Sequence, residues 1–324
     1  MQLSDEQRWL REAVDELLER EPGERLWAAL DEFGALGDEL GLVERALVAH
    51  GLGAGLAAVP YVDTAGAQYA VPGLPAGSTA AVCLAEAGRS FTPTAPATTL
   101  EDGRLAGRKS GVAFAASVDV LAVSAAGPDG LVVALVRPAA ATIEPETTLD
   151  PSLEFAAVDL DGVEPESVVA ADVALLAAAA GVLAAAETVG AASRLLALAR
   201  EYASQRRQFG RTIGSFQALR HLLADMYVGV ESSWSSVLYA AASLDEEQPD
   251  CLRTAAIAKA FSARATHDVA HGAMQVFGGV AFTAEHPAHR YLRRIVARGA
   301  QFGGAGEHER NLGRTLAPAL KALT

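Results

Sequence analysis

Two long helical patterns are joined by the stretch Tyr202-Ala-Ser-Gln-Arg206-Arg207-Gln208-Phe209-Gly210-Arg211-Thr212-Ile213-Gly214-Ser215-Phe216-Gln217. Together with Arg200 and Arg220 it holds five arginines, in a chain with 40 Asp and Glu, 26 Lys and Arg and a net charge of −14. A basic cluster in an acidic protein is a candidate anion site. Cations at a helix C-terminus are also stabilised by the helix dipole, and charge alone favours this plainer explanation. Charge alone does not distinguish an anion site from a charged helix end, so the order of residues in the stretch has to be considered.

Helical patterns continue on both sides of this stretch. Helices are predicted over about 172–202, 215–244 and 249–277, the first two starting at a capping aspartate (Asp172) and a capping serine (Ser215). Each has roughly 30 residues and a length of about 45 Å. A fourth helix is predicted over about 307–323, so residues 171–324 are expected to form a long four-helix bundle.

The first half of the chain divides into two further blocks. Residues 1–76 are expected to be helical, beginning with a capping box at Ser4 and Gln7 and including a helix from an Asp38 cap to about residue 50. Residues 77–170 carry short apolar runs at 79–84, 118–124, 131–136 and 155–160, separated by Asp-Gly and Pro-Asp-Gly turns. The chain is therefore predicted to be an α+β multidomain protein, with an N-terminal helical domain, a middle β-barrel or sandwich and a C-terminal bundle.

Composition excludes several classes of protein. The 324 residues suit two or three domains, and 51% hydrophobic residues can bury a sizeable core. An acidic balance is the opposite of that expected for nucleic-acid binding. Cys83 and Cys251 stand alone, no signal-peptide pattern precedes the first helix, and the apolar run 173–186 is too short to span a membrane. We expect a cytoplasmic protein without nucleic-acid or membrane partners.

The stretch 202–217 resembles the C-terminal domain of the acyl-CoA dehydrogenase family. The family motif is Y-x-x-x-R-x-x-F-G-x-x-(I/L)-x-x-x-Q followed by L-A-D-M, which appears here as Leu223-Ala-Asp-Met226. A second family motif, Q-x-x-G-G-x-(G/A)-(F/Y), appears as Gln275-Val-Phe-Gly-Gly-Val-Ala-Phe282. Both motifs have the family's usual separation, and the order of the three blocks matches the family over the whole chain.

In this family the two motifs bind FAD across a subunit interface. The resemblance implies that Arg206 meets the pyrophosphate of a neighbouring subunit's FAD, because guanidinium groups suit phosphate oxygens. Gly278 and Gly279 alone would be explained as a helix C-cap, but beside Gln275 and Arg206 they suggest a close approach of backbone to cofactor. The implied cofactor-binding residues are Arg206, Gln208, Phe209, Gln217, Gln275, Gly278 and Gly279.

The catalytic base of the family is missing. Family enzymes remove the α-proton of an acyl-CoA with a glutamate, while FAD takes a hydride from the β-carbon. The two usual positions of this glutamate are occupied by Gly303 and Ala180 in this chain, and neither side chain can accept a proton. Glu187 and Glu307 lie near them in sequence as alternative bases. A capping or solvated carboxylate is favoured for each, since a general base displaced by several ångströms loses its reach.

The β domain also departs from the family pattern. Glu86 is retained from the family's T-E-P-x-x-G-S-D loop, whose G-S-D part is absent. Lys109 is retained as the structural lysine of the family segment G-x-K-x-(W/Y)-I-(T/S). Gly111 stands where the family has the aromatic residue that stacks on the flavin. The N-terminal block is short for the family. The motif residues that hold a flavin within the same subunit of the family are thus largely absent. The motif residues that contact a neighbouring subunit's FAD are retained.

This division resembles the small, base-lacking subunits of the α2β2 acyl-CoA dehydrogenases of actinobacterial steroid catabolism. It implies a partner acyl-CoA dehydrogenase subunit that carries the base, a bulky steroid side-chain acyl-CoA as substrate, and an electron-transfer flavoprotein as acceptor. The chain alone is expected to be inactive. The alternatives are a purely structural or regulatory subunit, a homotetrameric enzyme with Glu187 or Glu307 as base, and a flavin-dependent oxygenase relative.

Two further groups support only structural interpretations. Arg290, Arg294 and Arg298 share one helix face, and Arg294 resembles a family arginine, whereas the other two are expected to pair with surface acids. His286 and His289 lack further ligand residues, so a metal site is not expected.

Overall fold

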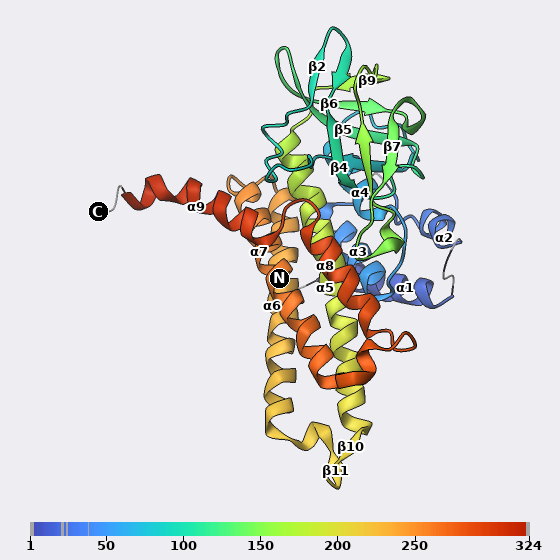
Figure 1. The fold of residues 1–324 in the computed structure, drawn as a ribbon, viewed down its shortest axis with the longest axis vertical. Coiled ribbons are helices and arrows are strands. Elements are labelled where there is room, and N and C mark those ends of the chain that lie inside the picture. The colour runs from blue at the N-terminus through green and yellow to red at the C-terminus, as the bar shows by residue number, and fades with distance from the viewer. Residues whose placement is uncertain (1–2, 21–22, 24, 38, 322–324) are drawn as a thin grey trace.

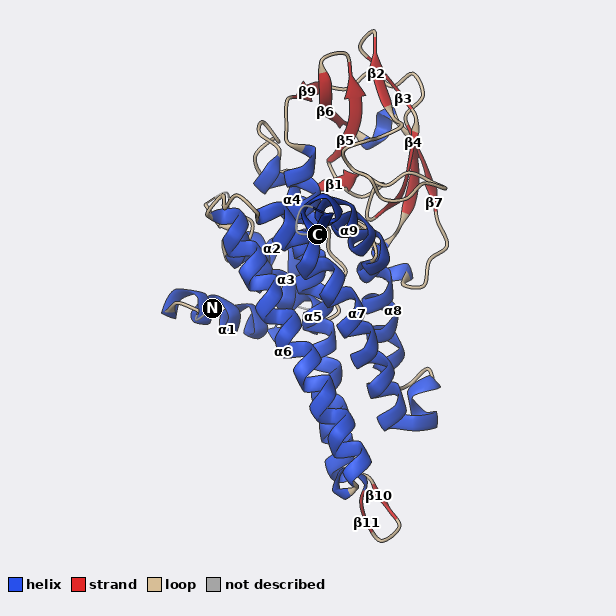
Figure 2. Ribbon diagram, turned by 90° about the vertical axis from the view of Figure 1, so that its left-hand side faces the viewer, coloured by secondary structure: helices blue, strands red, loops and turns tan. Residues whose placement is uncertain are grey.

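The computed structural model describes residues 3–20, 23, 25–37 and 39–321 and has three parts in chain order. A β region caps one end of a set of long helices, and the N-terminal helices pack along their side (Figures 1 and 2). The expected order of helices, β region and helical bundle is confirmed. The boundaries placed at residues 76 and 170 stay a prediction.

The N-terminal part contains α1 (Asp5–Arg20), α2 (Leu26–Glu32), α3 (Leu42–Ala54) and α4 (Tyr61–Ala70). The capping box before α1 is confirmed, because Ser4 N–H donates to Gln7 Oε1 at 3.0 Å and Gln7 N–H donates to Ser4 Oγ at 3.1 Å. Asp38 lies outside the described residues. Helix α3 starts later than expected, and its first N–H groups donate to the carboxylate of Asp245, far away in sequence.

The β region is built from two sheets around their own apolar core. One sheet has the order β3-β2-β5-β6-β9, with β1 pairing in parallel with β5, and the other has the order β4-β8-β7. The strands are β1 (Ala80–Cys83), β2 (Thr99–Glu101), β3 (Arg104–Ala106), β4 (Arg108–Val112), β5 (Val120–Gly127), β6 (Gly130–Val136), β7 (Thr142–Pro145), β8 (Ala156–Asp159) and β9 (Ser167–Val169). The four predicted apolar runs correspond to β1, β5, β6 and β8.

The bundle begins with the longest helix, α5 (Val173–Gln205), followed by α6 (Gln217–Asp245) and α7 (Cys251–Phe277). Asp172 caps α5 as predicted, since its carboxylate accepts the N–H groups of Ala174 and Leu175 at 2.8 and 3.1 Å. Ser215 is not a cap. Its hydroxyl donates to the carbonyl oxygen of Thr212 at 2.7 Å, within the 3-10 turn that precedes α6.

The fourth helix of the bundle differs from the prediction. The short α8 (Ala288–Ala300) packs against both α5 and α7. Helix α9 (Ala305–Lys321) covers most of the predicted range 307–323, whose last two residues lie outside the described part, but it packs on α7 and projects away from the bundle (Figure 1). Phe302 and Gly303 cause this change of direction, because both adopt left-handed backbone with φ of +57° and +92°.

One apolar core joins the N-terminal helices to the bundle. Helix α5 lies at its centre and contacts α3, α4, α6, α7 and α8. It is the one helix of the described chain that is long and apolar enough to cross a membrane, but 83% of its most apolar window is buried inside the protein. The apolar run 173–186 lies mostly within this core.

Candidate functional site

The first motif lies at the end of the bundle farthest from the β region (Figures 1 and 2). Arg206 ends α5, and β10 (Arg207–Gln208) pairs with β11 (Arg211–Thr212) in a small hairpin. The turn places Phe209 in left-handed backbone, with φ of +52° and a side chain that is 92% exposed. Within the part of the chain that the structure describes, the guanidinium of Arg206 has no hydrogen-bond or ion-pair partner.

The second motif ends at the same part of the molecule. The rings of Tyr202 and Phe277 lie 5.4 Å apart, so the ends of α5 and α7 are held together. Beyond Phe277 the chain turns through Gly278, with φ of +65°, into the 3-10 helix η4 (Gly278–Phe282). The seven residues singled out for a cofactor are all on this end, and all are exposed except the half-buried Gly278: Arg206, Gln208, Phe209, Gln217, Gln275, Gly278 and Gly279.

The first expected base position, Gly303, has no room for a side chain. A Cβ placed there would lie 2.7 Å from His308 Nε2 and 2.8 Å from Phe91 Cδ1, and the backbone is left-handed. His308 is held in place by its Nε2, which lies 2.9 Å from the carbonyl oxygen of Phe302. His308 and Phe91 therefore occupy the space that a glutamate side chain at position 303 would need.

The second base position, Ala180, is also closed. Ala180 is fully buried, and a Cβ on Gly66 of α4 would lie 3.2 Å from both its Cα and its Cβ. A longer side chain at Ala180 would therefore meet the backbone of α4. The short N-terminal part gives no extra room here, since α4 lies directly on α5.

A pair of glycine substitutions tests the closure at Gly303. Gly303→Ala is expected to lower the free energy of unfolding by about 1–3 kcal/mol, because it combines left-handed backbone with contacts to Phe91 and His308. Gly304→Ala is expected to change it by less than about 0.5 kcal/mol, since the nearest atom to a Cβ there is Glu307 Oε2 at 3.9 Å. Thermal melting of both variants compares them, and equal melting temperatures would contradict the crowding at Gly303.

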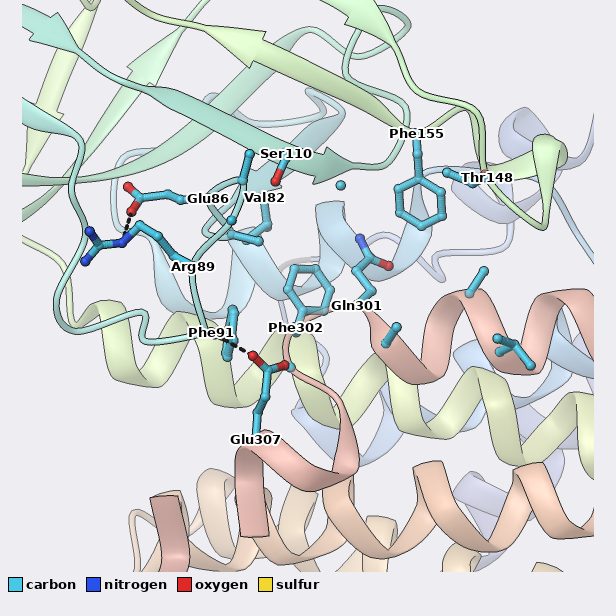
Figure 3. Close-up of a pocket in the computed structure, with 18 of the residues that line it drawn as sticks. Val82, Glu86, Arg89, Phe91, Ser110, Thr148, Phe155, Gln301, Phe302 and Glu307 are labelled. Carbon is cyan, nitrogen blue, oxygen red and sulfur yellow. Dashed lines mark hydrogen bonds and ion pairs between the residues drawn. The ribbon is translucent and has the colours of Figure 1, made fainter. Parts of the chain in front are cut away.

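A crevice opens between the β region and the turn that links α8 to α9 (Figure 3). It has a volume of about 490 Å³ and includes the family-like loop positions Glu86, Ser110 and Gly111 as well as Gly303. Phe91, Phe155 and Phe302 give it a largely apolar lining (Figure 3). We call this cavity the elbow crevice.

Neither carboxylate of the elbow crevice is free to act as a base. Glu307 accepts the N–H of Phe91 at 2.7 Å on Oε1 and the N–H of Gly304 at 3.0 Å on Oε2. Burial favours a higher pKa of Glu86, but hydrogen bonds from the N–H groups of Ala97 and Thr98 and from Lys109 lower the pKa of Glu86 to about 2. The suggestion that Glu307 replaces the base finds no support in this geometry.

Glu187 belongs to a buried ion network that the sequence did not reveal. Its Oε1 accepts from Arg294 Nη1 at 2.8 Å, and its Oε2 lies 2.9 Å from Arg298 Nε. Arg294 also pairs with Asp150 at 2.6 Å, and Arg298 with Asp63 at 3.3 Å. All five side chains are at least 90% buried. Glu187 is thus engaged by two arginines, which removes it as a relocated base.

The network corrects the expected role of Arg298. It was expected to pair with a surface acid, but it is 1% exposed and its acidic partners are buried. Burial raises the pKa of Asp63 to about 6, although Arg298 opposes this shift. The one sequence feature that indicated this network is the spacing of Arg294 and Arg298 by about one helical turn. That spacing places both residues on one helix face but does not show whether the face is buried or exposed.

The comparisons with known proteins agree with this architecture. Residues 177–315 match the family model described as acyl-CoA dehydrogenase, C-terminal domain. Acyl-CoA dehydrogenase FadE27 of Mycobacterium tuberculosis is 32% identical over an alignment that covers 93% of this chain and 90% of FadE27. The chain therefore belongs to the acyl-CoA dehydrogenase family, a family of oxidoreductases in which FAD is the implied cofactor.

Two solved structures are similar over almost the whole chain. One is the ChsE4–ChsE5 complex of Mycobacterium tuberculosis, with a TM-score of 0.86 and 26% identity over 98% of each chain. The other is a variant of the Tcur3481–Tcur3483 steroid acyl-CoA dehydrogenase, with a TM-score of 0.88 and 26% identity over 98% of this chain and 99% of that one. The first is named as a complex, and the name of the second joins two designations, Tcur3481 and Tcur3483.

Proposed function

We propose that this chain is the non-base subunit of a heteromeric, FAD-dependent acyl-CoA dehydrogenase. The observation that carries the proposal is the contrast between the two ends of the molecule. Gly303 and Ala180 are sterically closed, and Glu187 and Glu307 are engaged by other groups. The distal end, by contrast, presents its motif residues to solvent. A chain of this kind contributes to a cofactor site without performing the proton abstraction itself.

The distal residues fit the FAD of a neighbouring subunit. The exposed guanidinium of Arg206 has no partner among the described residues and offers paired donors to a pyrophosphate. The left-handed turn at Phe209 and Gly210 pushes an apolar ring outward beside it. Gln217 and Gln275, both exposed, are the proposed amide contacts to the rest of the cofactor. When bound, FAD accepts the hydride that leaves the β-carbon of the acyl-CoA.

The partner and the substrate follow from the same proposal. The base has to come from a partner acyl-CoA dehydrogenase subunit in an α2β2 assembly, as the two structures similar to this chain suggest. The word steroid in the name of one of them supports a bulky steroid side-chain acyl-CoA as the substrate class. An electron-transfer flavoprotein is the proposed electron acceptor, and the cytoplasm is the proposed location.

The cofactor assignment is tested by changing Arg206 in the co-expressed complex. Arg206→Ala is expected to weaken FAD binding by roughly 10- to 100-fold, because one charge-assisted contact to phosphate is lost. Retained FAD is measured from the visible spectrum and by titration of the deflavinated complex. Arg207→Ala is the matched control, since the neighbouring guanidinium donates to the Gly210 carbonyl inside the hairpin.

Three outcomes decide between the alternatives. Unchanged FAD affinity in Arg206→Ala would contradict the cofactor role and favour a purely structural subunit. A yellow homotetramer of this chain alone that oxidises an acyl-CoA would contradict the need for a partner. A colourless chain that forms a yellow complex with equal amounts of the two subunits, holding one FAD per pair, supports the proposal.

A further inference from the structure

The elbow crevice is large enough for a ligand of its own. Its volume of about 490 Å³ lies within the range of small-molecule sites. Most of its lining is apolar and comes from both the β region and α8, including Val82, Phe91, Phe155, Val296 and Phe302. An apolar hollow of this size between two structural units would favour a hydrocarbon-rich ligand.

The charges around the elbow crevice cancel. Glu86 and Glu307 are its two carboxylates, and both are occupied by hydrogen bonds from the protein. Arg89 Nε lies 3.3 Å from Glu86 Oε2, and the buried Lys109 Nζ lies 3.0 Å from Glu86 Oε1. A charged ligand would lose hydration in the crevice without meeting an unpaired charge of opposite sign. The crevice therefore favours a neutral ligand.

One side chain of the crevice carries a hydroxyl that is free to bind a ligand. Among the described residues, the hydroxyl of Ser110 has no hydrogen-bond partner, and Ser110 lines the cavity (Figure 3). A hydroxyl can donate a hydrogen bond to an oxygen acceptor on a ligand. A carbonyl or a hydroxyl oxygen meets this requirement.

One wall of the crevice is bare backbone. Gly111 has left-handed φ of +62°, and a Cβ built on it would have no atom within 4 Å. The flat face of a ligand can approach the main chain closely at this point. Phe155, directly before the neighbouring strand β8, and Phe302, from the turn between α8 and α9, also line the crevice, and their rings suit a broad apolar body.

From these observations we infer that the elbow crevice binds a neutral, bulky, hydrocarbon-rich molecule with a carbonyl or hydroxyl oxygen directed at Ser110. Binding there involves no proton abstraction by the protein, since neither carboxylate is available as a base. The inference does not depend on the FAD contacts proposed for the distal end, because the crevice is formed by other residues.

The test uses the co-expressed complex and two neutral probes. Nile red reports binding by its fluorescence, and progesterone, a rigid polycyclic ketone, competes with it. Ala300 lines the crevice at the exposed end of α8, so Ala300→Trp is expected to fill the cavity and weaken progesterone binding at least 10-fold. Ala140→Trp, at an exposed alanine of the 3-10 helix η1 (Pro138–Ala140), is the matched control and is expected to bind like the wild type.

A second variant and a charged probe test the chemistry. Ser110→Ala is expected to weaken progesterone binding by roughly 2- to 10-fold through loss of one hydrogen bond. 5β-Cholanate, a carboxylate on a similar hydrocarbon body, is expected to bind more weakly than progesterone.

Several results would overturn the inference. Unchanged progesterone binding in Ala300→Trp would place the probe elsewhere, and unchanged binding in Ser110→Ala would remove the proposed hydrogen bond. Tighter binding of 5β-cholanate would show an anion site. An FAD content above one per pair of subunits that falls in Ala300→Trp would show that the crevice holds flavin. Loss of FAD in Arg206→Ala tests the distal site separately, so failure of one proposal is distinguishable from failure of the other.

Discussion

Replacing Arg294 with methionine is expected to lower the free energy of unfolding by about 3–5 kcal/mol. The guanidinium donates to Asp150 Oδ2 at 2.6 Å, Glu187 Oε1 at 2.8 Å, the Ala57 carbonyl at 2.8 Å and Ser152 Oγ at 2.9 Å. Methionine fills much of the volume but donates none of these hydrogen bonds. Two buried carboxylates then lose a partner, which is the costly way to disrupt a buried ion pair.

The neighbouring arginine supplies the control for this experiment. Arg293 is exposed on α8, so Arg293→Met is expected to change stability by less than about 0.5 kcal/mol. Thermal melting of the same assembly measures both variants, and Arg294→Met is expected to melt at least about 5 °C lower than Arg293→Met. Similar melting temperatures would show that the network contributes little.

A double variant measures the interaction between Arg294 and Glu187 separately from their contacts with other residues. Arg294→Met combined with Glu187→Met is expected to destabilise by less than the sum of the two single changes, because the second removes a carboxylate that the first left unpaired. Asp150 still lacks its partner in the double variant, so full recovery is not expected. Additive effects would contradict the contact of 2.8 Å between Arg294 and Glu187.

Local patterns predicted much of the fold. The capping box at Ser4, the cap at Asp172 and the apolar runs of β1, β5, β6 and β8 rely on contacts between near neighbours, and the structure confirms them. The strands β2, β3, β4, β7 and β9 of the β region were missed. They are short and half-exposed, so their pairing is set by the neighbouring strand rather than by their own sequence.

The features that needed tertiary information were not predictable. Helical spacing placed Arg294 and Arg298 on one face, but only the fold shows that Asp63 and Glu187 lie opposite them. The motifs identified the distal residues as a candidate cofactor site because they carry a family resemblance, whereas the closure at Gly303 depends on the distant Phe91. The helix expected to end at about residue 50 continues to Ala54, so Gly51 and Gly53 are helical.

These helical glycines explain the second large effect that we expect. Helices α3 and α5 cross with their backbones in contact. A Cβ on Gly53 would lie 1.9 Å from the Glu187 carbonyl oxygen, and a Cβ on Gly190 would lie 1.8 Å from the His50 carbonyl oxygen. Neither helix can accept a side chain here unless the two axes move apart. Gly190→Ala is therefore expected to lower the free energy of unfolding by about 3 kcal/mol or more.

The same substitution elsewhere in α5 is expected to have the opposite sign. Gly181 is helical, and the nearest atom to a Cβ built there is Lys259 Cγ at 4.0 Å, so Gly181→Ala is expected to stabilise by about 0.5–1 kcal/mol. Thermal melting of the two variants in the same assembly measures the difference. A Gly190→Ala variant as stable as Gly181→Ala would mean that α3 can move away from α5. Room for a ligand could then open between these helices, and the N-terminal part could not be treated as fixed against the bundle.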